Sequence, residues 1–277
     1  MKKILLLAFA ALFLCSCAGV HVKKPEINDV KKVAIIGVTS NEEYQEDKSN
    51  DNKSSDKKKS KKKKVKDFLK NVAGNIIADN LKFLTEAQLE IITYGSDELA
   101  NAINGLNGWS VEPFENVVNN EAYKNAFKEG NNIANKIQKL TRKKRYTTPK
   151  KMYPIHFEAA HSKKENEEAE LQGLLSDLCE PLGVDAVAVA EYTFMYRKAS
   201  SSSATPIVLL NVAFIDKNGN EVLYTDKDWD RVEKGHASYD HGLKLWEKKS
   251  INGYKTAIDK AVSNFKNGTQ NALAKEK

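Results

Sequence analysis

The segment VDAVAVAEYTF, at residues 184–194, is apolar at most positions and rich in valine and aromatic residues. This composition is typical of a β-strand that is buried on both faces of a sheet. A second segment of the same kind, IVLLNVAFI, follows at residues 207–215. The turn-forming residues DKNGN come next at 216–220, and a short apolar segment returns at 222–225. This order predicts a β-hairpin of the second and third strands.

Two earlier segments predict further strands. The run VAIIGV lies inside a predicted buried strand at residues 30–39, and WSVEPF at residues 109–114 predicts a short one. Apolar residues at spacings of three and four predict four helical regions. The first begins at Val65, and the others cover residues 120–137, 165–179 and 254–273. The chain is therefore expected to be an α/β protein, with a mixed sheet flanked by helices.

Two features of the connections are predicted from turn and charge patterns. Gly95 followed by Ser96 predicts that the first helix stops there and that a second one begins. Residues 139–165 are basic and irregular, which predicts a solvated surface connection.

The N-terminus has the pattern of a bacterial export signal. Two lysines follow Met1, and residues 4–14 form an apolar run that is too short for a spanning helix, which needs about 20 apolar residues. The letters LCSC at 14–17 then resemble the lipobox of bacterial lipoproteins, in which Cys17 would carry the lipid. Ordinary secretion is the alternative, since SCA at 16–18 also fits a small-x-small cleavage site. Ala18 stands where an Asp would favour the inner membrane, so that the outer membrane is expected, with the domain facing the periplasm.

Four regions are expected along the chain. Residues 1–16 form the signal peptide, and residues 17–29 form a tether from the lipidated cysteine. A single α/β domain covers residues 30–265, and residues 266–277 form a polar tail. A polar segment at residues 41–64 interrupts the domain after its first strand and predicts a disordered insertion, because it cannot bury enough apolar surface to offset its ordering entropy.

The insertion contains a run of lysines, at Lys57, Lys58, Lys59, Lys61, Lys62, Lys63 and Lys64. These side chains could contact anionic lipid, lipopolysaccharide or an acidic protein, because each lysine near an anionic surface contributes about 1 kcal/mol. The alternative is a solvated loop, which is the usual state of like-charge blocks. Nucleic acid would fit the same lysines, but the export signal argues against such a partner.

Composition limits the chemistry that the chain can support. Of 277 residues three are cysteines, and two of these, Cys15 and Cys17, lie in the signal region. Cys179 would therefore be left without an intramolecular disulfide partner, and its apolar neighbours predict a buried side chain. The fold must then depend on an ordinary hydrophobic core.

No cofactor, metal site or catalytic group is predicted. The chain has no phosphate-binding loop, dinucleotide-binding glycine pattern or nucleophile elbow. Its histidines include two pairs spaced by five residues, which do not share a helical face; they are His156 with His161 and His236 with His241. Three acidic residues at 226, 228 and 230 would share one face of a strand, where a solvated strand end is expected more than a cation or a partner.

Four short motifs resemble a family of bacterial lipoproteins with a TolB-amino-terminal-like α/β domain. They are KVAII at 32–36, WSVEPF at 109–114, LGVDAV at 182–187 and VAFIDKNG at 212–219. Relatives of that family include the curli secretion lipoprotein and the lipoprotein activators of penicillin-binding proteins. The family shares no catalytic site, so the resemblance implies only the lipid-bearing role of Cys17.

The function expected from these features is a non-enzymatic, lipid-anchored interaction module of the bacterial envelope. It would regulate or scaffold an envelope assembly or cell-wall machine through a protein partner of unknown identity. A self-oligomerising structural or secretion component is the alternative, and an uncharacterised hydrolase built around His236, Asp240 and His241 is a more remote one.

Overall fold

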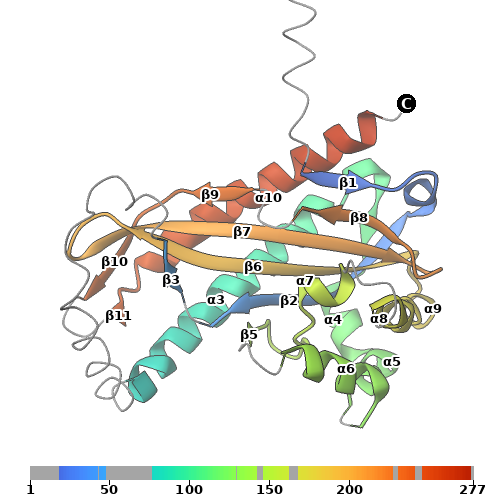
Figure 1. The fold of residues 1–277 in the computed structure, drawn as a ribbon, viewed down its shortest axis with the longest axis horizontal. Helices are drawn as coiled ribbons and strands as arrows, with labels where there is room; N and C mark the ends of the chain where they lie inside the picture. Colours follow the sequence, from blue (N-terminus) through green and yellow to red (C-terminus); the bar gives the residue numbers. More distant parts are fainter. Residues whose placement is uncertain are drawn as a thin grey trace, which may run out of the picture.

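The computed structural model describes residues 19–42, 44–47, 77–128, 130–141, 146–161, 168–226, 230–240 and 245–275. The predicted signal peptide, Cys17 and the lysine run lie outside these residues. The described residues form one mixed sheet with helices on both faces, which confirms the predicted fold class (Figure 1). The main strand order is β1-β8-β7-β6-β2-β4.

A long antiparallel hairpin forms the centre of this sheet. Strand β6 (Ala186–Lys198) pairs along its whole length with β7 (Ser203–Asp216), and β7 then pairs with β8 (Glu221–Thr225). The turn between β7 and β8 is held by the Asp216 carboxylate, which accepts hydrogen bonds from the backbone N–H groups of Asn218 (2.9 Å) and Asn220 (2.8 Å). This confirms the hairpin that the DKNGN motif predicts.

Parallel pairing makes the sheet a mixed one. Strand β2 (Lys32–Asn41) runs parallel to β6 on one side and to the short β4 (Ser110–Val111) on the other. Two-residue strands extend this part of the sheet: β3 (Gln45–Glu46) runs parallel to β6, and β5 (Tyr146–Thr147) runs antiparallel to β2. The predicted strands at 30–39 and 109–114 are thus present, the second in shortened form.

The two faces of the sheet bury two separate clusters of apolar side chains, because alternate residues of a strand point to opposite faces. The first face is covered by α3 (Ile77–Ile103), the 3₁₀ turn η3 (Leu106–Gly108) and α10 (Ser250–Ala274). The second face is covered by α4 (Phe114–Asn119), α5 (Glu121–Ala126), α6 (Asn132–Thr141), α7 (Phe157–Ala160), α8 (Glu168–Ser176) and α9 (Cys179–Leu182). Figure 1 shows α3 and α10 crossing behind the hairpin, while α4 to α9 gather at one side.

Three short strands complete the sheet beside β7. They are β9 (Arg231–Glu233), β10 (Ala237–Asp240) and β11 (Leu245–Trp246). Strands β9 and β10 both pair with β7, and β11 pairs with β10. Among the described residues, none of the helices is at once long enough and apolar enough to cross a bilayer.

The prediction of a tether at residues 17–29 is wrong for residues 19–29, which the structure describes. Residues Val20–Val22 form β1, which pairs with β8 at the edge of the sheet, and Glu26–Asp29 form the 3₁₀ turn η1. The side chains of Val20 and Ile27 are buried in the main core, at 2% and 0% exposure. Burial of these apolar groups stabilises the folded chain, so the domain begins about ten residues before its predicted start.

The polar tail predicted at residues 266–277 is also wrong over most of its length. Helix α10 continues to Ala274, and Thr269 and Ala272 are buried against the sheet. The Thr269 hydroxyl donates to the carbonyl of Phe265 (2.9 Å), which removes the cost of burying a polar group.

The helix break predicted at Gly95 is absent, and α3 runs through this residue without interruption. A Cβ atom at Gly95 would lie 3.1 Å from the ring of Tyr192, whose hydroxyl donates to the Gly95 carbonyl (2.7 Å). The glycine therefore permits close packing of the helix on β6, and it does not mark a helix end.

The segment predicted as a solvated connection at 139–165 is partly buried. Met152, Ile155 and His156 are at most 6% exposed, because this segment covers the outer edge of β2. A Cβ atom at Gly37 would lie 2.6 Å from the Cβ of Ile155, so the glycine in β2 is what lets the covering segment approach. The Met152 sulfur accepts a hydrogen bond from the backbone N–H of Val38 (3.0 Å).

Candidate interaction site

A groove of about 800 Å³ lies beside the β2–β4 edge of the sheet. It is lined by α3, by the first residues of α4, by the segment 149–151 and by one residue of α10. Its apolar lining includes Leu89, Tyr94 and Phe114, which are partly exposed and rest on the main core. Such a lining offers an apolar contact to a protein segment without opening the core.

Charged side chains of both signs line this groove, and those of Glu115 and Lys151 pair with each other (3.6 Å). Helix α3 contributes Glu86, Glu90 and Asp97, and the segment after β5 contributes Lys150 and Lys151. All five residues are exposed. A partner segment with both signs of charge would therefore find a complementary surface on either side.

A small polar network holds the wall between α3 and α10. Lys255 pairs with Glu90 (2.8 Å), and its ammonium lies over the Tyr94 ring, 5.1 Å from the centroid. The Tyr94 hydroxyl donates to the Asp259 carboxylate (2.5 Å), and this hydrogen bond raises the pKa of the phenol above its usual range. The two helices are thus fixed to each other where the groove opens.

Two carboxyl groups near this edge differ in the direction of their pKa shifts. Partial desolvation raises the pKa of Asp97, which lines the groove. The ion pair with Lys32 lowers the pKa of Glu112, which also accepts a hydrogen bond from the side chain of Asn116 (2.7 Å). Among the described residues Asp97 has no ion-pair partner, so a bound cationic group would stabilise its charge.

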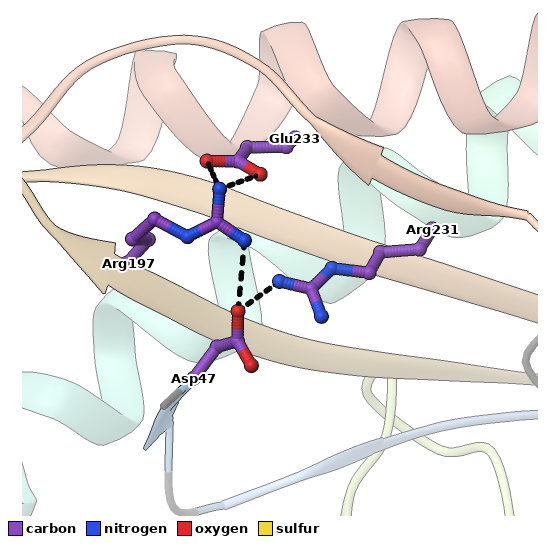
Figure 2. A network of polar contacts seen from close by, with 4 residues as sticks. All are labelled: Asp47, Arg197, Arg231 and Glu233. Carbon is purple, nitrogen blue, oxygen red and sulfur yellow. Dashed lines mark hydrogen bonds and ion pairs between the residues drawn. The ribbon is translucent and has the colours of Figure 1, made fainter. Parts of the chain in front are cut away.

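A second polar cluster joins strands β3, β6 and β9 and is shown in Figure 2. The Asp47 carboxylate is 9% exposed and accepts hydrogen bonds from Arg197 (3.0 Å) and Arg231. Arg197 also pairs with Glu233 (2.5 Å). Because two guanidinium groups pair with the nearly buried Asp47 carboxylate, this cluster fixes the chain directly after β3, before the segment that carries the lysine run.

A third cluster lies at the β1–β8 edge of the sheet, where four aromatic rings stack in a row. Ring centroids are 4.8 Å apart for Phe157 and His161, and 4.7 Å apart both for His161 and Tyr224 and for Tyr224 and His21. Each histidine also contacts a carboxylate; His161 pairs with Glu221 (2.8 Å) and His21 with Asp226 (3.0 Å). The stack ties β1 to β8 and to the segment after α7.

The remaining sequence-predicted residues do not converge on a site. His156 is buried, whereas His236 is exposed and lies 3.2 Å from the Ser238 hydroxyl. Asp230 accepts a hydrogen bond from Asn264 (3.1 Å), whereas Asp226 pairs with His21. His241 and Asp228 lie outside the described residues. Within the described part of the chain, no group of three or more His, Cys, Asp and Glu side chains could hold a metal ion.

Cys179 is buried, as its apolar neighbours predict, with 1% of its surface exposed. Burial raises the pKa of its thiol to about 12, and the nearby carboxylates of Asp216 and Asp185 act in the same direction. A thiol of this pKa stays protonated at neutral pH and is a poor nucleophile.

Comparisons with family models, with curated proteins and with solved structures give no match to this chain. Sequence reasoning missed the groove, because its walls come from four elements that are far apart in the sequence. A local signal was Phe114 at a helix start, which is partly exposed and belongs to a residue type that is enriched in interfaces.

Proposed function

We propose that the protein is a lipid-anchored interaction module of the bacterial envelope, held at the outer membrane by Cys17 and facing the periplasm. It would carry no enzymatic activity and would regulate or scaffold an envelope assembly or cell-wall machine. The export signal and the lipobox-like sequence support the anchor, and the resemblance to TolB-amino-terminal-like lipoproteins supports the class.

The observation that carries this proposal is the groove beside the β2–β4 edge. It combines a partly exposed apolar lining with exposed charges of both signs, which could serve as the apolar centre and the polar rim of a protein interface. The partner that fits it best is an exposed segment of an envelope protein, with apolar side chains for Leu89 and Phe114 and charges on either side.

The proposal is tested by placing a photo-crosslinking residue in the groove in living cells. Thr93 is exposed and lines the groove, whereas Ser201 is exposed at the tip of the β6–β7 hairpin and serves as the matched control. Mass spectrometry of the adducts is expected to find an envelope assembly protein or a cell-wall synthase at position 93 and not at position 201.

Two other outcomes would decide against the proposal. Adducts of the protein with itself alone would favour the self-assembling structural or secretion role. Equal capture at Thr93 and Ser201 would mean that the groove has no special part in binding.

A further inference from the structure

We infer that the surface formed by β1 and the C-terminal half of α10 is the membrane-facing surface of the domain, with anionic phospholipid head groups as its ligands. This inference rests on the proposed lipid anchor at Cys17. It goes beyond that anchor because it says which surface meets the lipid and which surface is left for a partner.

The first argument is the length of chain between the anchor and the sheet. The Gly19 carbonyl already accepts a hydrogen bond from the backbone N–H of Asp226 (2.7 Å), and Val20 then pairs with Thr225. Two residues of extended chain span at most about 7 Å, so Gly19 would lie within roughly that distance of the Cα atom of an acylated Cys17. The domain then has no free tether with which to turn its other faces to the bilayer.

The second argument is what lies around this attachment point. Helix α10 packs along β1, and the Lys24 ammonium donates to the carbonyl of Leu273 (3.0 Å) near the helix end. Figure 1 shows β1 beneath the last turns of α10, so these two elements share one side of the molecule.

The charge of this surface fits anionic lipid. The C-terminal half of α10 and the residue after it, 262–275, contain no Asp or Glu, and the two lysines in this range, Lys266 and Lys275, are exposed. Among the carboxylates next to β1, Asp226 contacts His21 and Glu26 contacts Lys23 (3.7 Å), while Asp29 in η1 is exposed. Asp230, near Lys260, accepts from Asn264. Each lysine close to an anionic head group contributes about 1 kcal/mol, which is enough to orient a domain that is already tethered.

The third argument is the position of the groove. In the strand order, β1 and β4 are the two ends, five strand spacings apart, which at about 4.8 Å each is roughly 25 Å. The groove lies beside β4 and β5, so a domain that rests on β1 and α10 would present it away from the lipid. This distance exceeds the range of head-group charge, which is about 8 Å at physiological ionic strength.

The test measures energy transfer from a dye on the protein to acceptor dyes on lipid head groups. The full-length lipoprotein is purified with its acyl chains and placed in vesicles of phosphatidylethanolamine and phosphatidylglycerol. One dye is attached through Asn267→Cys on α10, and the matched one through Asn125→Cys on α5, because both asparagines are exposed. Because Cys179 is buried, it should not react with the dye. The parent protein, treated with the same dye, serves as the control for this.

Energy transfer is expected to be several-fold higher from position 267 than from position 125. The double variant Lys266→Gln/Lys275→Gln should lower the transfer from position 267 in these vesicles and leave it unchanged in vesicles of phosphatidylcholine alone. Equal transfer from the two positions, or higher transfer from position 125, would overturn the orientation. An unchanged signal in the double variant would overturn the head-group contact.

Mass measurement of the same preparation separates this inference from the proposed function. Protein that lacks acyl chains at Cys17 would contradict the anchor itself. Acylated protein with equal transfer from both positions would contradict only the orientation.

Discussion

The two ends of the sheet are finished in different ways. At the β1 end, backbone pairing with β8, buried Val20 and Ile27 and a stack of four rings close the edge tightly. At the β4 end, β4 and β5 each pair two residues with β2, and the elements around them leave a groove of about 800 Å³. Under the proposed function, the first end would serve attachment and the second would serve recognition.

The largest expected effect comes from removing a buried side chain at the closed end. Ile27→Ala should lower the free energy of unfolding by about 2–5 kcal/mol, because the side chain is fully buried in the main core. The neighbouring Asn28 is exposed, and Asn28→Ala should change stability by less than about 0.5 kcal/mol. Urea unfolding of a soluble form measures both. If Ile27→Ala proved neutral, residues 20–29 would be a tether after all.

An effect of intermediate size on thermal stability is expected at two helical glycines, which lie on opposite faces of the sheet. Replacement of either glycine by alanine gains about 1 kcal/mol of helix propensity. At Gly173 the new Cβ meets open space, so Gly173→Ala should raise the melting temperature. At Gly95 it would meet the Tyr192 ring at 3.1 Å, so Gly95→Ala should lower it. Calorimetry that found the same sign for both variants would contradict the packing of α3 on β6.

The smallest effect is a pH dependence at the open end. The raised pKa of Asp97 means that its charge destabilises the folded state above that pKa, so Asp97→Asn should stabilise the protein at neutral pH. The lowered pKa of Glu112 means that its charge stabilises the folded state above the ordinary value of about 4.3, so Glu112→Gln should destabilise it there.

The difference in the free energy of unfolding between each of these two variants and the parent protein should shrink toward zero in acid. There the two carboxyl groups are protonated in the folded and unfolded states alike. Unfolding by urea at a series of pH values checks both signs. Effects of equal sign at neutral pH would show that the two carboxylates do not differ in their surroundings.

The sequence alone predicts the parts of the fold that have a strong local pattern. The β6–β7–β8 strands, β2 and α10 follow directly from apolar runs and helical spacing. It cannot predict β1, because three residues of strand carry no periodicity, and it misreads Gly95, because the reason for that glycine is a ring from a distant strand. The same limit hides the groove, which exists only once α3, α4 and the 149–151 segment are brought together.

The measurement that tests the account most directly is metabolic labelling with a palmitate analogue, followed by separation of membrane and soluble fractions. The intact chain is expected to take up label and to sediment with the outer membrane, whereas Cys17→Ser should be unlabelled and soluble in the periplasm. Label on the Cys17→Ser variant, or an intact chain that stays soluble without label, would contradict the anchor and, with it, the assignment of one sheet edge to attachment.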